Sequence, residues 1–202
     1  IKTNKTNLII TLKEISQLNP IASTKEFRHY FNHLSISPLS TGFIFLHLMD
    51  NFKSRTSRLF YYNLKTAKLS QVSERPVSHY TWKDDSHLLV TEMNNGRYYY
   101  VLYNIITLHR KILGSNLLFR DGHPSILKGN NNYFICDSYR DKLGYQSLFL
   151  FDVLKSSKKN ILKIYIPNKF QGEQKCDLHP RLSNDNKTVC IDMVSEGRRA
   201  MG

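Results

Sequence analysis

The sequence predicts an all-β protein with the architecture of a β-propeller, and two observations support this prediction. First, aromatic and branched residues fall in short alternating runs bounded by Asn, Asp, Gly, Lys or Ser, which is typical of strands. Second, a unit of about 45 residues with three or four short strands recurs along the chain, as it does in propeller blades. The aromatic runs cover residues 43–46, 59–62, 98–103 and 148–151.

Four histidines mark the repeat: His33, His79, His123 and His179, at spacings of 46, 44 and 56 residues. Each is followed three positions later by a large apolar residue, and then by a polar turn and a second apolar strand. Equivalent positions of successive blades meet at the mouth of the central channel. We therefore expect an imidazole cluster suited to metal binding or proton transfer. The alternative is an unrelated all-β sandwich in which the spacing arises by chance.

The repeat divides the chain into an N-terminal segment and four blades. The boundaries fall at 1–30 for the N-terminal strand or linker segment and at 31–75, 76–119, 120–168 and 169–202 for the blades. Within the first segment, residues 8–18 fit a short helix about as well as a strand. Because the fourth unit stops early, we expect a truncated chain, part of a larger ring whose number of missing blades stays open.

The composition favours binding to polyanions and a reducing compartment. The chain has 29 Lys and Arg against 16 Asp and Glu, and its net charge of +13 attracts acidic polymers. Three cysteines, an odd number, argue against a disulfide scaffold. The sequence shows neither the roughly 18 consecutive apolar residues of a membrane span nor a signal peptide. We therefore expect no transmembrane segment and a cytoplasmic location.

Nucleic acid is the least favoured of the polyanions. The lysines of residues 155–163 lie in outer-turn segments of the predicted blades, and the sequence contains no recognised nucleic-acid-binding module. An acidic polysaccharide or oligosaccharide is therefore the favoured partner, while the sequence leaves the oligomeric state undefined.

A cysteine stands three positions before the last histidine of the repeat. Cysteine and histidine are ligands that suit zinc or a similar transition metal. The sequence therefore predicts a metal site formed by His123, Cys176 and His179, with His79 or water completing it. In the alternative interpretation, Cys176 is a small buried hydrophobe and the histidines bond backbone carbonyls between blades.

Acidic residues recur 13 or 14 positions after three of the histidines. These residues are Glu92, Asp137 and Asp192. Two roles are open for them: they cap the end of a strand, or they orient an imidazole from behind, as carboxylates do next to metal-binding histidines.

Four stretches carry a resemblance to a known group of proteins: residues 78–82, 121–125, 137–141 and 176–181. Over residues 30 to 202 the chain resembles bacterial propeller proteins encoded with polysaccharide genes. That group is similar to oligogalacturonate lyases and, more loosely, to propeller-type ulvan lyases. The resemblance implies a seven-bladed propeller with a divalent metal over the channel, held mostly by histidines.

The resemblance also implies a ligand set. Cys176 stands where the family has Gln, His179 matches the first histidine of the motif, and Arg181 replaces the second. His123 matches the ligand from the preceding blade. These departures from the family pattern favour zinc over manganese.

For the reaction, the resemblance implies β-elimination at a uronate, in which a base removes the proton α to a neutralised carboxylate. His79 matches the family's base, Arg55 falls near its arginine, and Tyr139 could protonate the leaving oxygen. For Tyr139 the alternative is a hydrogen bond between blades. The residues expected to bind further substrate are Arg58, Arg198 and Arg199, the last two having a solvated turn as their alternative.

Two functions follow from these expectations, and both stay open at this point. One is a metal-dependent polysaccharide lyase that acts on an acidic glycan. The other is a non-catalytic propeller that binds an acidic glycan or a partner protein during polysaccharide biosynthesis. A propeller scaffold serves many functions, so the fold alone favours neither.

Overall fold

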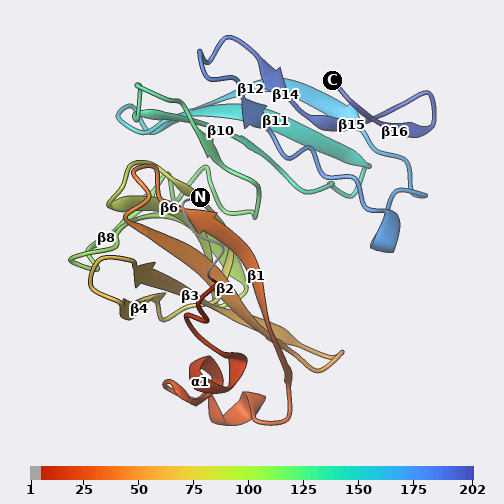
Figure 1. Cartoon of the computed structure of the whole chain (residues 1–202). Helices are drawn as coiled ribbons and strands as arrows, with labels where there is room; N and C mark the ends of the chain where they lie inside the picture. Colours follow the sequence, from red (N-terminus) through yellow and green to blue (C-terminus); the bar gives the residue numbers. More distant parts are fainter. Residues whose placement is uncertain (1–5) are drawn as a thin grey trace. The chain divides into compact units, whose positions relative to one another are not determined.

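A computed structural model describes residues 6–202 of the 202-residue chain (Figure 1). The chain forms two compact units, the first ending at Pro76 and the second spanning Val77–Gly202. Within the described residues the α-helical content is one helix of six residues, α1 (Leu12–Gln17). The predicted all-β class is therefore confirmed, and the four-stranded antiparallel sheets are those of a partial β-propeller.

The first unit contains one four-stranded antiparallel sheet in chain order. Its strands are β1 (Arg28–Ile36), β2 (Gly42–Asp50), β3 (Arg55–Asn63) and β4 (Lys68–Ser73). Strand β2 is buried along nearly its whole length, which explains its continuous run of apolar residues instead of an alternating one. The aromatic run at 43–46 thus lies in the interior of this sheet.

The N-terminal segment of the first unit covers one face of that sheet. Thr11 and Glu14 form a capping box, in which the Thr11 hydroxyl accepts from the Glu14 amide (3.1 Å) and the Glu14 carboxylate accepts from the Thr11 amide (2.7 Å). This cap starts α1, so residues 12–17 are helical. Ile15 of the helix is fully buried against Phe43, Phe45 and Phe60. A single 3₁₀ turn, η1 (Ala22–Thr24), leads into β1.

The second unit contains two complete four-stranded antiparallel sheets, each in chain order, and a smaller third group. The first sheet comprises β5 (Val77–Trp82), β6 (His87–Asn94), β7 (Arg97–Asn104) and β8 (Arg110–Leu113). The second comprises β9 (Ser125–Ile126), β10 (Tyr133–Asp137), β11 (Tyr145–Asp152) and β12 (Ser157–Tyr165).

The third group consists of two strand pairs. After the 3₁₀ turn η2 (Gly172–Gln174), β13 (Arg181–Leu182) pairs with β14 (Val189–Cys190), and β15 (Asp192–Ser195) pairs with β16 (Arg198–Met201). Across the chain, the sheets span 28–73, 77–113, 125–165 and 181–201. No helix within residues 6–202 combines the length and apolar character needed to cross a bilayer.

Successive sheets of the second unit pack face to face, as propeller blades do. Tyr100 of β7 stacks on Phe134 of β10 with ring centroids 5.8 Å apart, and Phe134 contacts Phe151 of β11 at 5.2 Å. The next interface joins Ile135 and Leu148 to residues of the following group, among them Leu178 and Ile191. Such burial is the main force that holds adjacent sheets together.

Candidate functional site

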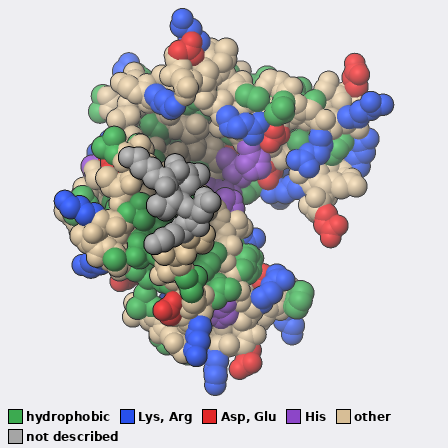
Figure 2. Space-filling view, viewed as in Figure 1, with side chains coloured by type: hydrophobic (Ala, Val, Ile, Leu, Met, Phe, Trp, Pro, Cys, Tyr) green, Lys and Arg blue, Asp and Glu red, His purple; other side chains and the backbone are tan. Residues whose placement is uncertain are grey.

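Three histidines of the second unit lie together, at similar positions in its two four-stranded sheets and in its last group. His79 lies in β5, while His123 and His179 each stand two residues before the first strand of their sheet, β9 and β13. The ring centroids of His79 and His123 are 4.1 Å apart, and those of His123 and His179 are 3.8 Å apart. In the space-filling view, histidine side chains gather in a patch on the visible face (Figure 2).

The Nδ1 atom of each imidazole forms a hydrogen bond with an oxygen atom of an aspartate. The acceptors are oxygens, so Nδ1 carries the hydrogen and the neutral ring keeps its lone pair on Nε2. A carboxylate or carbonyl behind an imidazole is the usual support of a metal ligand or a general base. The three pairs are His79 with Asp121 Oδ1 (3.1 Å), His123 with Asp137 Oδ2 (2.9 Å) and His179 with the carbonyl of Asp177 (3.2 Å).

Asp121 anchors His79 from the loop that leads into the next sheet. Its carboxylate also accepts a hydrogen bond from the Ser78 hydroxyl (2.6 Å) and from the amide of Gly122 (2.9 Å). Burial acts to raise the pKa of Asp121, but the hydrogen bonds from His79 and Ser78 outweigh it, and the pKa lies below its usual value. Asp121 is therefore ionised at neutral pH.

Asp137, at the end of β10, ties two of the histidines together. Its carboxylate accepts from the backbone amide of His123 (2.6 Å) and from that of His179 (3.0 Å), in addition to the His123 ring. Burial opposes ionisation, but these bonds hold the pKa of Asp137 below its usual value. Of the two roles left open for Asp137, the structure shows the orientation of an imidazole.

The other acidic residues of that series act differently. Glu92 is fully buried and accepts from the Tyr103 hydroxyl (2.7 Å) and from the Arg110 guanidinium. Asp192 binds the guanidinium of Arg181 (2.6 Å). The similar spacing in the sequence therefore does not give the three residues one role, although Asp192 Oδ2 also lies 3.8 Å from His179 Nδ1.

A close approach of the backbone positions His123. A side chain at Gly122 would place its Cβ atom 2.2 Å from the carbonyl oxygen of Asp137, a distance that no Cβ tolerates. Glycine at this position lets the loop lie directly against the end of β10. The His123 amide thereby reaches the Asp137 carboxylate.

Tyr139 and Lys175 border the histidines. The Tyr139 ring lies edge-on to His123, with centroids 5.6 Å apart, and 6.3 Å from His79. Lys175 places its Nζ 3.7 Å from the centroid of the Tyr139 ring and 2.7 Å from Asp177 Oδ2. Burial, reinforced by nearby carboxylates, raises the pKa of Tyr139 well above its usual value, so the phenol keeps its proton at neutral pH.

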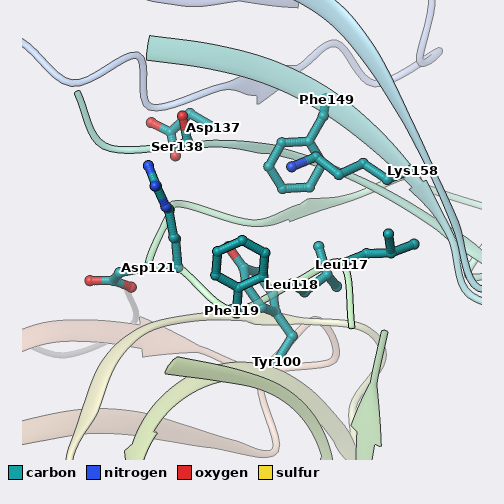
Figure 3. A pocket seen from close by; sticks show the side chains of 10 residues that line it. Tyr100, Leu117, Leu118, Phe119, Asp121, Asp137, Ser138, Phe149 and Lys158 are labelled. Atoms are coloured by element: carbon teal, nitrogen blue, oxygen red, sulfur yellow. The ribbon is translucent and has the colours of Figure 1, made fainter. Parts of the chain in front are cut away.

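A small cavity lies behind the two anchoring carboxylates (Figure 3). Its volume is about 40 Å³, which suits one or two water molecules. Asp121 and Asp137 line it together with Tyr100 and Phe149, and Lys158 extends its Nζ over the Phe149 ring at 4.0 Å. The carboxylates thus stand between the histidines and a pocket of water size.

Cys176 lies in an apolar cluster of the second unit. Its side chain has no exposed surface and packs in an apolar cluster with Ile166 and Phe170. Burial raises the pKa of the thiol, which disfavours the thiolate that a metal needs. This position favours the alternative stated for Cys176, a small buried hydrophobe. Among residues 6–202, no group of three His, Cys, Asp or Glu side chains has the arrangement of a metal site.

The buried position of Cys176 gives a direct prediction. Replacing Cys176 by serine is expected to leave metal content unchanged and to lower the free energy of unfolding by about 1–3 kcal/mol, because a hydroxyl replaces sulfur among apolar side chains. Metal analysis and urea denaturation of the variant measure the two effects. Loss of metal with an intact fold would return Cys176 to the ligand set.

Two of the arginines expected from the sequence belong to the first unit. Arg55 and Arg58 belong to β3 of the first unit, as His33 belongs to its β1, whereas the three histidines belong to the second unit. Arg58 is 3% exposed, and its guanidinium donates to the backbone carbonyls of Ile15 (2.7 Å) and Asn19 (2.9 Å). The N–H groups of the Arg58 guanidinium therefore bind backbone carbonyls within the first unit.

Arg198 and Arg199 lie at the start of β16, in an exposed hairpin with β15. Their guanidinium groups are accessible to solvent, which leaves both a glycan contact and a solvated turn open. Sequence reasoning did not select Asp121, Asp177 or Lys175. A signal for the first two exists, because Asp-x-His-Pro occurs twice, at 121–124 and at 177–180.

Comparison with solved structures identifies the fold. The chain is similar to TolB from Acinetobacter baumannii (15% identity, TM-score 0.60, covering 86% of this chain and 40% of that one). It is also similar to an oligogalacturonate lyase in complex with manganese (11%, 0.53, 87% and 65%) and to an acylaminoacyl peptidase from Pyrococcus horikoshii (11%, 0.51, 89% and 33%). No protein-family model and no curated protein matches the sequence.

These likenesses establish a β-propeller fold and no more. The chain spans between a third and two thirds of the length of the three structures, which belong to proteins of different kinds. Oligogalacturonate lyases are among these neighbours, as the resemblance in the sequence predicted. The neighbours do not bear on an origin in polysaccharide gene clusters.

Proposed function

We propose that the second unit carries a lyase-like site, which binds an acidic glycan and removes a proton α to a uronate carboxylate. The observation that carries the proposal is the row of three imidazoles, each with its Nδ1 bonded to an oxygen acceptor. This arrangement supplies Nε2 lone pairs side by side, and such lone pairs either bind a cation or accept a proton. The likeness to an oligogalacturonate lyase supports the same class of reaction.

Two neighbouring imidazoles are available to a divalent cation, one fewer than the three protein ligands of a typical catalytic zinc site. His123 and His179 would hold it through Nε2, since each has its Nδ1 anchored and the two rings lie 3.8 Å apart. When bound, the cation would neutralise a substrate carboxylate and so acidify the adjacent C–H bond. With Cys176 in the apolar core, imidazole is the remaining donor type. Without a thiolate ligand from Cys176, the reason to favour zinc over manganese is weaker.

His79 is suited to the role of base. Its Nδ1 donates to the ionised Asp121, which fixes the ring orientation, places the lone pair on Nε2 and stabilises the imidazolium formed after proton transfer. Tyr139 stays protonated at neutral pH and lies beside both His79 and His123. In this proposal Tyr139 protonates the leaving oxygen.

Positive charge next to the site favours an acidic substrate. Lys175 is half exposed, and its ammonium group lies over the Tyr139 ring beside the histidines. In the last group, Arg181 of β13 is paired with Asp192, whereas Arg199 of β16 is exposed. A uronate-containing glycan is thus complementary in charge to this part of the second unit.

A second candidate function is binding of an acidic glycan or a partner protein without catalysis. The position of Arg58 favours it, because this arginine, expected to bind further substrate, is engaged with backbone carbonyls of the first unit. In this case the histidines would recognise a ligand without proton transfer. The variants described below distinguish the two functions.

Alanine at His123 or His179 is expected to remove bound metal and to abolish elimination. Either change deletes one of the two imidazoles proposed to hold the cation, and apparent stability should fall since bound metal stabilises the native state. Metal analysis of the purified protein and ultraviolet absorbance of unsaturated uronate on a panel of acidic glycans measure both effects. His109→Ala, at an exposed position outside the site, is the matched control.

The outcomes separate the candidate functions. Metal with product supports the lyase proposal, and metal with glycan binding but without product supports the non-catalytic one. A wild-type protein that takes up no divalent metal and forms no product with any acidic glycan would contradict the lyase proposal.

A further inference from the structure

The first unit contains a buried hydrogen-bonded relay that is independent of the histidine site. His47 of β2 lies at its centre with no exposed surface. Its Nδ1 faces Arg58 Nη2 (3.0 Å), and its Nε2 lies 2.9 Å from His29 Nδ1. His29 in turn places Nε2 3.3 Å from the carbonyl oxygen of Thr24. The relay thus runs from β3 through β2 and β1 to the N-terminal segment.

The partners determine the tautomer of both rings. A carbonyl accepts, so His29 carries its hydrogen on Nε2 and accepts at Nδ1. His47 must then donate from Nε2 and accept at Nδ1 from the Arg58 guanidinium. Every ring nitrogen has a matched partner only while both imidazoles are neutral.

The relay holds the segment Leu12–Thr24 on the sheet. Arg58 donates to the carbonyls of Ile15, Leu18 and Asn19, which are the carbonyls that a helix end leaves without intrahelical partners. His29 binds the carbonyl of Thr24 at the other end of the segment. Arg58 therefore holds the segment at residues 15–19 and His29 holds it at Thr24, while the Ile15 side chain is buried.

A proton on either ring breaks this pattern. On His47 it would add a hydrogen at Nδ1, facing the cationic Arg58, and on His29 it would add one at Nδ1, facing the Nε2 hydrogen of His47. The groups that face His47 and can carry charge are Arg58 from β3 and His29 from β1, and the N-terminal segment contributes backbone carbonyls. No carboxylate is among these contacts of the described residues to stabilise the added charge.

We propose that this relay is an acid-sensitive latch, in which protonation of His47 or His29 releases the segment Leu12–Thr24 and uncovers the aromatic face of the first unit's sheet. The face comprises Phe43, Phe45 and Phe60, against which Ile15 packs. A groove of about 540 Å³ adjoins it, with residues 7–10 as one wall and Phe31, Phe43 and Phe45 as another. Release of the segment would open this groove to larger apolar ligands.

The pH range over which the segment is released follows from the pKa of the buried His47 ring. Burial, with the charge of Arg58, lowers the pKa of His47 to about 4, against an ordinary value near 6.5. The released form therefore binds the proton more tightly. The segment Leu12–Thr24 is held most firmly above a pH of about 6.5, and its hold weakens as the pH falls toward 4. At pH 4 the equilibrium between the bound and the released segment should have shifted toward release by roughly 10- to 100-fold.

Hydrogen–deuterium exchange of the full chain, corrected for the intrinsic pH dependence of exchange, tests the proposal. Between pH 7 and 4.5, peptides covering residues 12–24 should lose protection by at least about 10-fold, while peptides from β6 should not. Gln at 29 and 47 preserves a neutral donor and acceptor. The double variant His29→Gln, His47→Gln should therefore retain protection at both pH values, and His109→Gln should behave as the wild type.

Two results would overturn the latch: protection of residues 12–24 that does not change with pH in the wild type, or acid release that persists in the folded double variant. If the double variant does not fold, NMR titration of the wild-type imidazoles decides. Coincident midpoints below pH 6 for His47 and the α1 resonances support the latch. A midpoint near 6.5 for His47 with unchanged α1 resonances contradicts it.

Discussion

Replacing His79 by alanine is expected to lower the rate of elimination by about 10²–10⁴-fold while metal content and fold stay unchanged. This is the usual range for loss of a general base. The residue is suited to that test because Asp121 holds its ring through Nδ1, and because it is not one of the two histidines proposed to hold the cation. Turnover measured by ultraviolet absorbance, together with metal analysis of the same preparation, gives the result.

A matched control distinguishes the loss of a base from a general effect on histidine–carboxylate pairs. His87 also lies in the second unit and bonds a carboxylate, Asp84, through Nδ1 (2.9 Å), but in a turn away from the three-histidine row. His87→Ala should retain turnover. A His79→Ala variant with wild-type turnover would show that another group removes the proton.

Replacing Asp137 by alanine is expected to lower the free energy of unfolding by roughly 3–5 kcal/mol. The change leaves the backbone amides of His123 and His179 without their acceptor and removes the oxygens that orient the His123 ring. Because Asp137 connects two sheets, the loss should also lower metal content. Urea denaturation monitored by near-ultraviolet circular dichroism measures the change.

The exposed Asp185, which caps a turn through the Ser183 hydroxyl and the Lys187 amide, provides the comparison. Asp185→Asn should cost under about 1 kcal/mol. Asp137→Asn keeps the shape of the side chain and should fall between the two. Equal stability of Asp137→Ala and the wild type would contradict the role assigned to this carboxylate.

The sequence was sufficient to predict the strands, because their signal is local. Aromatic runs at 43–46, 59–62, 98–103 and 148–151 lie within β2, β3, β7 and β11, the inner strands of their sheets. A strand that is buried on both faces consists of adjacent apolar residues, and no distant partner is needed to recognise it. Residues 8–18 were ambiguous since the helix there depends on a capping box and on packing against the sheet.

The histidine row and the role of Asp137 could be predicted from the repeat, whereas the bond from His79 to Asp121 could not. The repeat places His79, His123 and His179 in one register, and the fold then brings them together. The bond from His79 to Asp121 joins residues 42 positions apart on successive sheets. The repeated Asp-x-His-Pro motif marks Asp121, but it does not show that the carboxylate of Asp121 bonds His79 of the preceding sheet.

Cys176 and Arg58 show that the sequence pattern does not predict the surroundings of a side chain. Cys176 has the spacing to His179 of a ligand pair, but the direction of its side chain depends on the apolar residues that cover it, Ile166 and Phe170. For Arg58, burial depends on carbonyls at the end of α1, a helix whose existence was itself undecided from the sequence. Both cases turn on tertiary packing that a local pattern does not encode.

The face-to-face packing of the sheets in the second unit has a consequence for how this unit opens. Each sheet buries its apolar side against a neighbour, so local unfolding should proceed sheet by sheet and begin where the interstrand ladder is shortest. Among the described strands, the ladders β9–β10 and β13–β14 have two residue pairs each, and of these only β13–β14 stands in a two-stranded sheet, in the last group. A fluctuation there would detach His179 while His79 and Asp121 remain in place, so the row of imidazoles would assemble and disassemble from one end.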